Sequence, residues 1–382
     1  MDNSDASRTF ASVWNRHLSN ALPRIPSQPE HKSSEQQPFV LHHLSAKPKK
    51  QALTESSSTS DTLTTHLLML GYDGVYILAL ELLVYRSAFY TTLFVSKADS
   101  TGFLKLNIRL VITSILRTFI LSISRKDIPT RICLFARAQP QYIFPDSGTN
   151  GFKHVLTDRQ LTEWWIRALD SLLCIFNNPK ARLHIPGAEK GDIKYVLRKV
   201  SSAWSAGHIF DANLTELAVN KIPNFPDDPK SRFIDSISAE NRDSDTSVSQ
   251  FFDELQMRQE FRLGFVVGII GVEGIIANPT DLELQGAIVE SKIYTRIHDA
   301  IVTGHYGNLK DARNATAAVY KVMPEGAMFE IKGSLENDKE SKKVEAKKEP
   351  VVNVIGGMMV RKRAKPSHVS VSEEFKKAKT EV

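Results

Sequence analysis

Two kinds of apolar segment alternate along this chain. In one kind the apolar residues are continuous and show no period, and in the other they have the spacing of a helix. Val75–Tyr85 is a run of the first kind, and it predicts either one buried strand or a strand that leads into a helix. Leu110–Ile123 predicts a buried helix with Arg117 on its polar side, and Thr130–Ala136 predicts a strand. Because helices and strands interleave, the sequence predicts an α/β fold with a mixed central β-sheet surrounded by helices.

Two capping boxes mark the starts of helices. Thr157 and Gln160 have the spacing of a capping box, as do Ser247 and Gln250. In such a box the hydroxyl caps the helix, and the glutamine side chain accepts from the backbone N–H of the capping residue. The second box predicts a long helix from about Val248 to Val272. The first precedes an apolar helix face made of Leu161, Trp164, Trp165, Ala168, Leu169, Leu172 and Leu173. The other expected elements are strands at Phe39–Leu44, Thr91–Ser96 and Arg182–Ile185 and helices at Phe10–Leu22, Ile193–Val200, Ser231–Ala239, Tyr294–Thr303 and Leu309–Met323.

Polar and charged stretches divide the chain into three parts. Residues 1–65 are expected to be partly disordered and to contribute one helix and one strand, because Ser-rich segments surround both. Residues 66–336 form the predicted main domain. Residues 337–382 are a charged linker, Asn337–Pro350, and a flexible basic tail with the cluster Arg361–Lys365.

Composition excludes several classes of protein. Lys and Arg exceed Asp and Glu by 49 to 43, and this mildly basic balance suits a nuclear protein. Cys133 and Cys174 are too few for a disulfide scaffold or a cysteine-based zinc site. Met1–Asn20 lacks the apolar core of a secretory signal, and Leu263–Val272 is about half a membrane span, so we expect a soluble protein.

Several catalytic motifs are missing from the sequence. There is no GxxxxGK[ST], no GxGxxG after a strand, no GxSxG and no HExxH. His42 and His43 are the one close pair of histidines, and neighbours on a strand point to opposite faces. We therefore interpret them as ordinary surface or loop histidines rather than metal ligands.

Two segments have compositions that suit a functional site. Phe225–Phe233 places Asp227, Asp228, Lys230 and Arg232 between aromatic residues at the start of a helix. Its plain interpretation is a polar helix start capped by one of the aspartates. The other segment, Leu134–Pro145, is a strand that runs into an aromatic loop. Its plain interpretation is an ordinary core strand and turn.

Five stretches together resemble the fungal-specific histone acetyltransferase family first named for regulation of Ty transposition, and they occur in the family's order. They are Leu93–Gly102, Ile132–Ser147, Lys153–Trp165, Ile222–Ile234 and Arg258–Gly274. The likeness extends roughly from Phe10 to Glu336, with weaker similarity in Met358–Lys365. It implies a fold similar to that of the CREB-binding-protein acetyltransferases.

The resemblance also implies an activity and partners. The family transfers acetyl from acetyl-CoA to lysines of histone H3, in the N-terminal helix of the histone core near the points where DNA enters and leaves, and in the tail. It acts on histones H3–H4 with chaperones of the anti-silencing-function and nucleosome-assembly-protein types. The implied setting is nuclear: replication-coupled nucleosome assembly, transcription regulation, DNA repair and genome stability. No metal, membrane or direct DNA contact is expected.

Site residues follow from the resemblance position by position. A loop of Ala98, Asp99 and Ser100 would contact acetyl-CoA, as would Phe135 and Arg137 from the strand and backbone groups of His154, Val155 and Leu156. Trp165 would wall the acetyl-lysine tunnel, whereas Trp164, about 100° away round the helix, would belong to the core. Asp228 would be the acid/base and Lys230 the autoacetylated lysine. Asp227, Arg232 and Tyr142 would support them, and Asn107, Ile108 and Arg109 complete the implied cofactor residues.

The chemistry of the reaction explains these residue types. Helix N-termini suit the pyrophosphate of CoA, and an aromatic wall suits a lysine stem. The attacking amine must be neutral, although a free lysine titrates near ~10.4 and a free aspartate near ~3.9. Either the protein alters the acidity of Asp228, or Asp228 orients the amine and relays its proton through water.

Two features separate this chain from the family pattern. The link between Ser124 and Ile132 is short where other members carry a long insert, and Phe103–Val111 aligns poorly. A first alternative is therefore a catalytically weak histone-chaperone-binding module. A second is a basic nucleic-acid binder, which only the net charge of +6 and the tail cluster favour. We interpret Arg361–Lys365 with Lys376 and Lys377 as a nuclear localisation signal and a contact for acidic chaperones.

Overall fold

The computed structural model describes residues 3–25 and 38–335, apart from 55, 57, 59, 211, 212, 259, 260 and 262–266, and it leaves the side chains of residues 3–8 undescribed. These residues lie in one compact unit, Met1–Asn337. The helices are α1 Asn3–Leu18, α2 Ile108–Ile123, α3 Asp158–Asp170, α4 Lys190–Leu197, α5 Ala218–Lys221, α6 Pro229–Ala239, α7 Val248–Leu255, α8 Ser291–Val302 and α9 Leu309–Tyr320, with 3-10 turns at Ser19–Ala21, Ser147–Thr149 and Leu173–Ile175. The strands are β1 Phe39–Ala46, β2 Lys49–Lys50, β3 Thr62–Tyr72, β4 Val75–Arg86, β5 Thr91–Ser100, β6 Thr130–Ala136, β7 Phe176–His184, β8 Trp204–Ala206, β9 Gly268–Ile276, β10 Ala287–Val289 and β11 Met328–Ile331.

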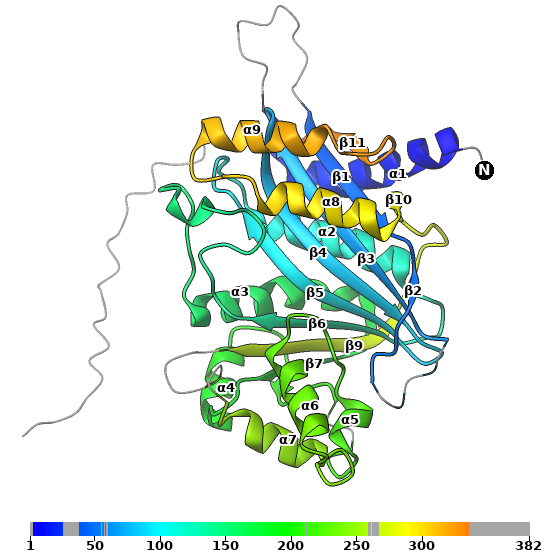
Figure 1. Cartoon of the computed structure of the whole chain (residues 1–382), viewed down its shortest axis with the longest axis vertical. Helices are drawn as coiled ribbons and strands as arrows, with labels where there is room; N and C mark the ends of the chain where they lie inside the picture. The colour runs from blue at the N-terminus through cyan, green and yellow to red at the C-terminus, as the bar shows by residue number, and fades with distance from the viewer. Residues whose placement is uncertain are drawn as a thin grey trace, which may run out of the picture. The chain divides into compact units, whose positions relative to one another are not determined.

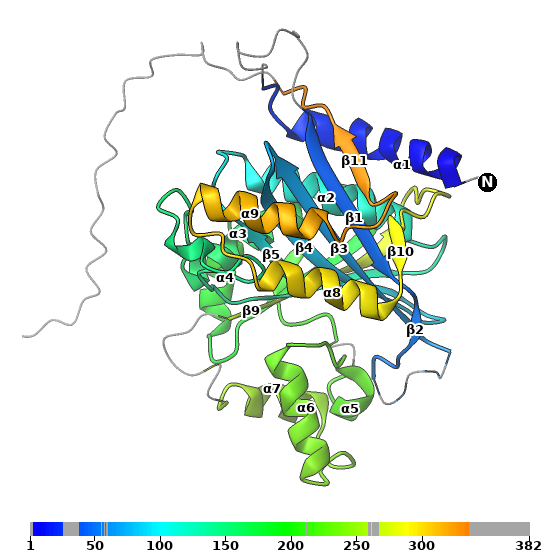
Figure 2. The same cartoon turned by 45° about the horizontal axis from the view of Figure 1, so that its top comes forward.

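All these strands join one mixed sheet in the order β10-β1-β3-β4-β5-β6-β9-β7-β8, with β11 beside β1 and β2 beside β3. Strands β5 and β6 are parallel, as are β1 and β10, whereas β3, β4 and β5 are antiparallel neighbours. Helices α8 and α9 lie on one face and α1 and α2 on the other, while α5, α6 and α7 lie beside β6, β9 and β7 (Figures 1 and 2). The predicted α/β fold is confirmed.

The core divides into layers because side chains alternate along each strand. On β5 and β6, Leu93 and Leu134 face the large cluster that includes α2 and α3. Their neighbours Phe94 and Cys133 face the opposite side, where they pack with Phe225 from the loop before α6. Residues one position apart on these strands therefore serve different sites.

Strand β5 extends further than predicted. A loop was expected from Lys97, but the strand continues to Ser100, because Lys97–Ser100 still pairs with β4. Pairing between β5 and β6 ends at Val95 and Leu134. Strand β6 therefore does not pair with the last half of β5. Ala98, Asp99 and Ser100 lie at the end of a strand rather than in a loop.

The predicted long helix from Val248 to Val272 is wrong. Helix α7 ends at Leu255, and Gly268–Ile276 is strand β9 between β6 and β7. A strand buried on both faces is as continuously apolar as a buried helix, so periodicity could not distinguish them. Glycine at 268 permits the close approach of α3, since a Cβ there would lie 2.8 Å from the Thr162 side chain.

The second capping box is only half formed. Ser247 caps α7 through the backbone N–H of Gln250, but the Gln250 side chain bonds to Glu254 instead of returning to the cap. Other predictions are confirmed within a few residues: β6 has the predicted bounds, Val75–Tyr85 is one strand, and the helix expected at Ser231–Ala239 is α6, which begins at Pro229.

The prediction that His42 and His43 lie on the surface or in a loop is wrong. Both are buried in β1, an inner strand covered by helices on both faces. Their opposite orientation is confirmed, because His42 lies against Tyr76 whereas His43 lies against His66. The predicted linker 337–350 and the tail clusters lie outside the described residues, and the domain boundaries at 65 and 336 stay predictions. No helix in the described ranges is long and apolar enough to cross a membrane.

Candidate active site

A cavity of about 410 Å³ lies between the first turns of α2 and α3 and the end of β5, and is called here the α2–α3 cavity. Ten of the twelve residues predicted to contact the cofactor line it, and they come from three separate segments: Ala98, Asp99, Ser100, Asn107, Ile108, Arg109, His154, Val155, Leu156 and Trp165. Tyr142 lines it too. Phe135 and Arg137 do not line the α2–α3 cavity. Strand β6 turns Phe135 toward the opposite face of the sheet, where it packs with α5–α7.

Asp99 is a buried anchor of this cavity. Its Oδ2 accepts hydrogen bonds from the three consecutive amides of Tyr142–Phe144, at 2.8, 2.9 and 3.1 Å. Its Oδ1 accepts from the Ser100 amide at 2.8 Å and from Lys153 Nζ at 2.7 Å. A carboxylate has about four acceptor positions. With them filled, Asp99 positions the wall of the cavity rather than offering a free carboxylate to a ligand.

Lys153 was missed by the sequence analysis. Its side chain is 7% exposed and pairs with Asp99, and its Nζ also donates to Ser147 Oγ at 2.7 Å. The available signal was its place directly before His154 in one of the five family-like stretches. A buried aspartate requires a cation or several N–H donors nearby, and here it has both.

Two helix starts border the cavity. Asn107 caps α2 by accepting from the Leu110 amide at 3.2 Å, and Thr157 caps α3 in the complete capping box that was predicted. Asp158 Oδ1 accepts from the Ala138 amide at 2.6 Å and so fixes the loop after β6 to α3. First-turn N–H groups and the helix dipole favour an anion at such an edge, where Arg109 is also exposed.

The assignment of Trp164 rather than Trp165 to the core is wrong, and the role of Trp165 as a wall of the acetyl-lysine tunnel stays a prediction. Trp165 is 6% exposed and belongs to the main core, whereas Trp164 is half-buried. Both line the α2–α3 cavity, and their rings meet edge to face with centroids 4.9 Å apart. The two side chains leave the helix about 100° apart, so Trp165 faces the core while Trp164 lies at the side of α3, and both border the cavity.

Trp165→Ala is therefore expected to lower the free energy of unfolding by about 3–5 kcal/mol, as for other large buried aromatic residues. Trp164→Ala should cost less than half of that, since part of its ring is already exposed. Urea unfolding of the two variants measures the difference. Equal losses, or a larger loss for Trp164→Ala, would contradict the packing described here.

Asp228 and Lys230 form a second, separate locus on the other face of β5 and β6. Lys230 Nζ lies 2.5 Å from Asp228 Oδ2, donates to the Pro223 carbonyl at 2.8 Å and lies 4.7 Å from the Phe225 ring centroid. Asp228 Oδ1 also accepts from the Lys230 amide and caps α6, so of the two expected caps it is Asp228. Both side chains are almost completely buried. They line a small cavity with Phe94, Cys133 and Phe135, and neither lines the α2–α3 cavity.

Asp227 links this locus to β5. Its backbone has a positive φ of 57°, its side chain is mostly exposed, and its Oδ2 lies 3.3 Å from Lys97 Nζ. Lys97 directly precedes Ala98, a wall of the α2–α3 cavity. Arg232 lies on α6 with an exposed side chain.

Three titratable side chains near the Asp228–Lys230 pair, those of Cys133, His208 and Tyr85, are uncharged at neutral pH. Burial raises the pKa of the Cys133 thiol to about 12 and lowers the pKa of His208 to about 3, where the charges of His184, Arg182 and Lys230 act in the same direction. Burial and the Asp228 carboxylate raise the pKa of Tyr85 well above its ordinary value. The ion pair is thus the charged element of an otherwise neutral pocket. No group among the described side chains has the composition of a metal site.

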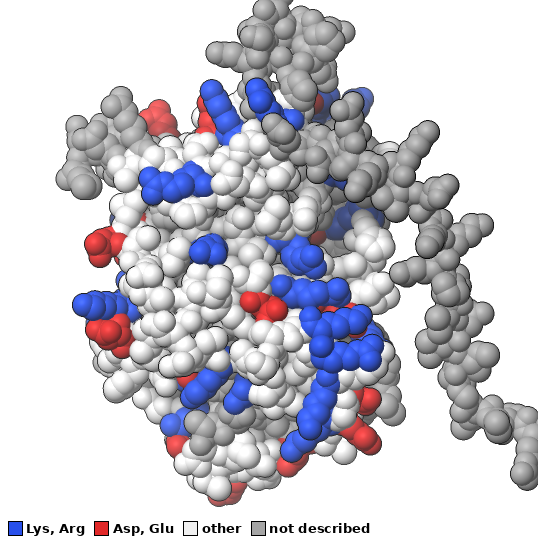
Figure 3. Space-filling model, turned by 180° about the vertical axis from the view of Figure 1, so that it is seen from behind, with Lys and Arg blue, Asp and Glu red and all other residues white. Residues whose placement is uncertain are grey.

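The distribution of Lys and Arg side chains on the surface bears on whether the protein binds nucleic acid. Viewed from behind, Lys and Arg side chains gather toward one edge with Asp and Glu among them (Figure 3). On α4 the exposed Tyr195 lies with its ring centroid 3.7 Å from the Arg198 guanidinium and 5.6 Å from that of Arg159. Because the protein's own arginine covers the ring, Tyr195 is not a free stacking surface for a base.

Comparison with known proteins identifies related chains. The histone acetyltransferase KAT11-type domain matches residues 30–128 and 121–322. The histone acetyltransferase RTT109 of Candida albicans is 44% identical over 141 residues, which cover 37% of this chain and 38% of that protein. The histone acetyltransferase rtt109 of Schizosaccharomyces pombe is 31% identical over 279 residues, or 66% of this chain and 73% of that protein. The Aspergillus flavus protein of the same name is 30% identical over 266 residues, or 55% of this chain and 47% of that protein.

A solved structure supports the fold. The crystal structure of Rtt109 from Aspergillus fumigatus superposes with a TM-score of 0.72 and covers 85% of this chain and 99% of that one, at 24% sequence identity. At this level of identity the match concerns the fold alone.

Proposed function

This chain belongs to the family of KAT11-type histone acetyltransferases, and on that premise we propose that it transfers acetyl groups from acetyl-CoA to lysines of histone H3. The observation that carries the proposal is the α2–α3 cavity, in which residues 98–109 meet the distant residues 153–165 at two helix starts. We propose as targets a lysine of the N-terminal helix in the histone core and lysines of the tail.

The α2–α3 cavity has the chemistry that acetyl-CoA requires. Its wall includes the apolar side chains of Leu78, Ile112, Leu161 and Trp165, which suit a pantetheine arm. The helix starts and Arg109 suit phosphate oxygens. The bound cosubstrate would supply an acetyl thioester, and the residues of the cavity would orient it and keep water away.

The Asp228–Lys230 pair supports a role in handling a lysine amine. A substrate lysine must lose a proton before its nitrogen can attack a carbonyl carbon. In this structure the Asp228 carboxylate is already bound to the Lys230 ammonium. We propose that autoacetylation of Lys230 converts that ammonium into a neutral amide and frees Asp228 to accept or orient the substrate's proton.

The proposed setting is nuclear, in replication-coupled nucleosome assembly and genome stability. The proposed partners are histones H3–H4 and chaperones of the anti-silencing-function and nucleosome-assembly-protein types. The net charge of +6 supports contact with acidic chaperones. Incubation with acetyl-CoA, H3–H4 and each chaperone, followed by mass spectrometry of the acetylated lysines, tests the proposal.

Acetyl-CoA is expected to raise the melting temperature of the free protein. A ligand at a hundred times its Kd stabilises the native state by ~2.7 kcal/mol. Arg109→Ala should reduce the shift, because Arg109 lines the cavity, whereas Lys105→Ala should not, because Lys105 is exposed outside it. Differential scanning fluorimetry over a range of acetyl-CoA concentrations measures both.

The same titration separates the alternatives. A catalytically weak chaperone-binding module would bind chaperone without any response to saturating acetyl-CoA. That result, together with unmodified histones, would replace the proposed activity by the binding function.

A further inference from the structure

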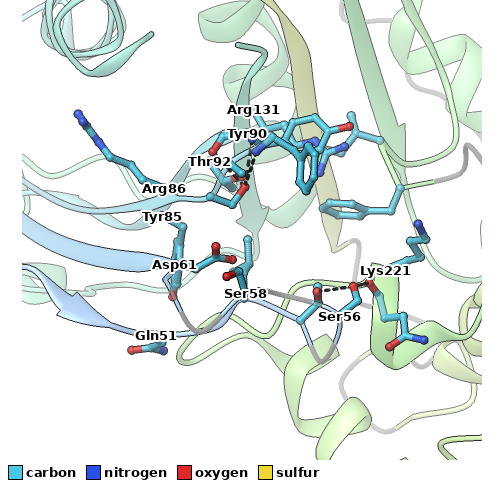
Figure 4. Close-up of a pocket in the computed structure, with 18 of the residues that line it drawn as sticks. Gln51, Ser56, Ser58, Asp61, Tyr85, Arg86, Tyr90, Thr92, Arg131 and Lys221 are labelled. Carbon is cyan, nitrogen blue, oxygen red and sulfur yellow. Dashed lines mark hydrogen bonds between the residues drawn. The ribbon is translucent and has the colours of Figure 1, made fainter.

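A second large cavity, of about 440 Å³, lies where β4 ends and β5 and β6 begin, facing the segment around α5 (Figure 4). It is called here the β4–α5 cavity, and its polar wall includes Asp61, Tyr85, Arg86, Arg131 and Lys221. Its volume falls within the range typical of ligand-binding pockets. None of these residues lines the α2–α3 cavity.

The cations of the β4–α5 cavity already have partners. Each arginine or lysine of its wall lies in an ion pair with a glutamate, and Arg86 points away from the cavity centre (Figure 4). The Arg131 guanidinium also lies 3.3 Å from the centroid of the Tyr90 ring. The ion pairs are Arg86–Glu283 at 2.7 Å, Arg131–Glu273 at 2.5 Å and Lys221–Glu216 at 2.6 Å.

Asp61 has no such partner. The residue is 4% exposed, and within the described ranges no hydrogen bond or ion pair reaches its carboxylate, which lies beside Ser58 inside the cavity (Figure 4). Its backbone is fixed, because its N–H donates to the Ser58 carbonyl and its carbonyl accepts from Gln51. The hydroxyl of Tyr85, in the same wall, is also buried without a described partner.

This arrangement specifies the charge of the missing group. Burying a carboxylate without a counterion or N–H donors is costly, so such a group is retained where a ligand supplies them. An ionised carboxylate only accepts hydrogen bonds, and the Tyr85 hydroxyl can accept one as well. The complementary ligand therefore carries a positive charge and several N–H donors, as lysine and arginine side chains do.

The β4–α5 cavity adjoins the Asp228–Lys230 locus. Ile209 and Phe210 line both cavities. Tyr85 packs against Phe225 with ring centroids 5.6 Å apart, and Phe225 is the ring next to the Lys230 ammonium. A peptide that presents one residue near Asp228 could thus place a neighbouring side chain near Asp61.

We propose that the β4–α5 cavity binds a lysine or arginine side chain of the basic peptide substrate, with the Asp61 carboxylate as its counterion and the Tyr85 hydroxyl as a further acceptor. The inference rests on the proposed function for the identity of the peptide, but the site itself rests on the geometry of Asp61. It gives the enzyme a means of selecting target lysines by a basic residue next to them.

The test uses small probes and the whole protein. N-acetyl-arginine methylamide and N-acetyl-lysine methylamide should bind the wild type by calorimetry or NMR titration, and the neutral isostere N-acetyl-citrulline methylamide should bind roughly ten- to a hundredfold more weakly. Asp61→Asn should bind all three equally weakly. With H3–H4, Asp61→Asn should raise the KM for histone by a similar factor and leave kcat and the KM for acetyl-CoA unchanged.

Controls separate the site from the fold and from the activity. Asp61→Asn should melt at about the same temperature as the wild type, because no hydrogen bond or ion pair within the described ranges depends on the carboxylate. Asp253→Asn, which neutralises an exposed carboxylate on α7, should change no binding constant. Equal binding of arginine and citrulline probes by the wild type overturns the site even if histones are acetylated. Asp61-dependent probe binding without any acetylation keeps the site and rejects the proposed function.

Discussion

Asparagine in place of Asp228 is expected to lower the free energy of unfolding by about 3–5 kcal/mol, because it leaves the Lys230 ammonium buried without its counterion. The loss is electrostatic rather than a loss of capping, since asparagine caps a helix as well as aspartate does. On the proposed function the same change abolishes both histone acetylation and Lys230 acetylation. Urea unfolding and a histone acetylation assay with chaperone present measure the two effects.

The neighbouring aspartate is the matched control. Asp227 differs from Asp228 by one position, but its side chain is mostly exposed and its partner Lys97 is only partly buried. Asp227→Asn should therefore cost less than about 1 kcal/mol. A double-mutant cycle with Asp228→Asn and Lys230→Met should show strong coupling, with the double variant more stable than Asp228→Asn alone. Additive losses would show that the pair does not stabilise the fold as a unit.

Lys230 variants then separate charge from catalysis. Lys230→Arg retains the charge and should weaken acetyl-CoA use, whereas Lys230→Gln resembles the acetylated side chain and should be milder. If protein purified from cells lacks acetyl-Lys230 and Lys230→Arg has wild-type kinetics, the residue is a structural partner of the helix cap and the autoacetylation proposal fails.

Local chemistry explains which parts of the fold could be predicted from the sequence. The capping box at Thr157 and the proline after Asp228 determine helix starts within a few residues, so α3 and α6 were placed correctly. The length of β5 depends on its pairing with β4 across the sheet, and the identity of β9 depends on β6 and β7 at its two sides. No pattern within a strand encodes those distant neighbours.

The same limit applies to the site. The family resemblance placed ten predicted cofactor residues at one cavity because it carries three-dimensional information in its motifs. It did not indicate that Asp99 uses its carboxylate to hold Tyr142–Phe144, since those contacts depend on how the aromatic loop folds back. Asp61 lies in a Ser-rich stretch that resembles an ordinary loop in sequence. Only burial distinguishes it from a solvated aspartate.

Acid is expected to unfold this protein cooperatively at about pH 5, well above the range in which most carboxylates titrate. Four histidines are buried and a fifth, His184, is half-buried, and the fold holds all five in the neutral form. Burial lowers the pKa of His42 and His184 to about 4 and of His43 and His208 to about 3, and it lowers the pKa of His66 well below 6.5. In the unfolded chain each of them binds a proton near pH 6.5, so the stability that they contribute is complete above pH 6.5 and is lost as the pH falls toward the folded values. Each group adds about 1.4 kcal/mol per pH unit in that window, which makes the loss at pH 5.5 on the order of 7 kcal/mol, comparable with the whole stability of a domain.

Urea unfolding at pH 8, 7, 6 and 5.5 measures this slope, and single variants assign it. His184→Gln should reduce the slope by about one proton, because it removes one group that the folded state keeps neutral. His305→Gln is the control: Asp146 bonds to this exposed histidine and raises its pKa, so His305 takes up its proton in the folded state before the unfolded chain does. Its removal should leave the acid slope as steep as before. A free energy of unfolding that is flat between pH 7 and 5.5 would mean that the buried histidines gain protons without unfolding, and water would then have to reach β1 and β3, where His42, His43 and His66 lie.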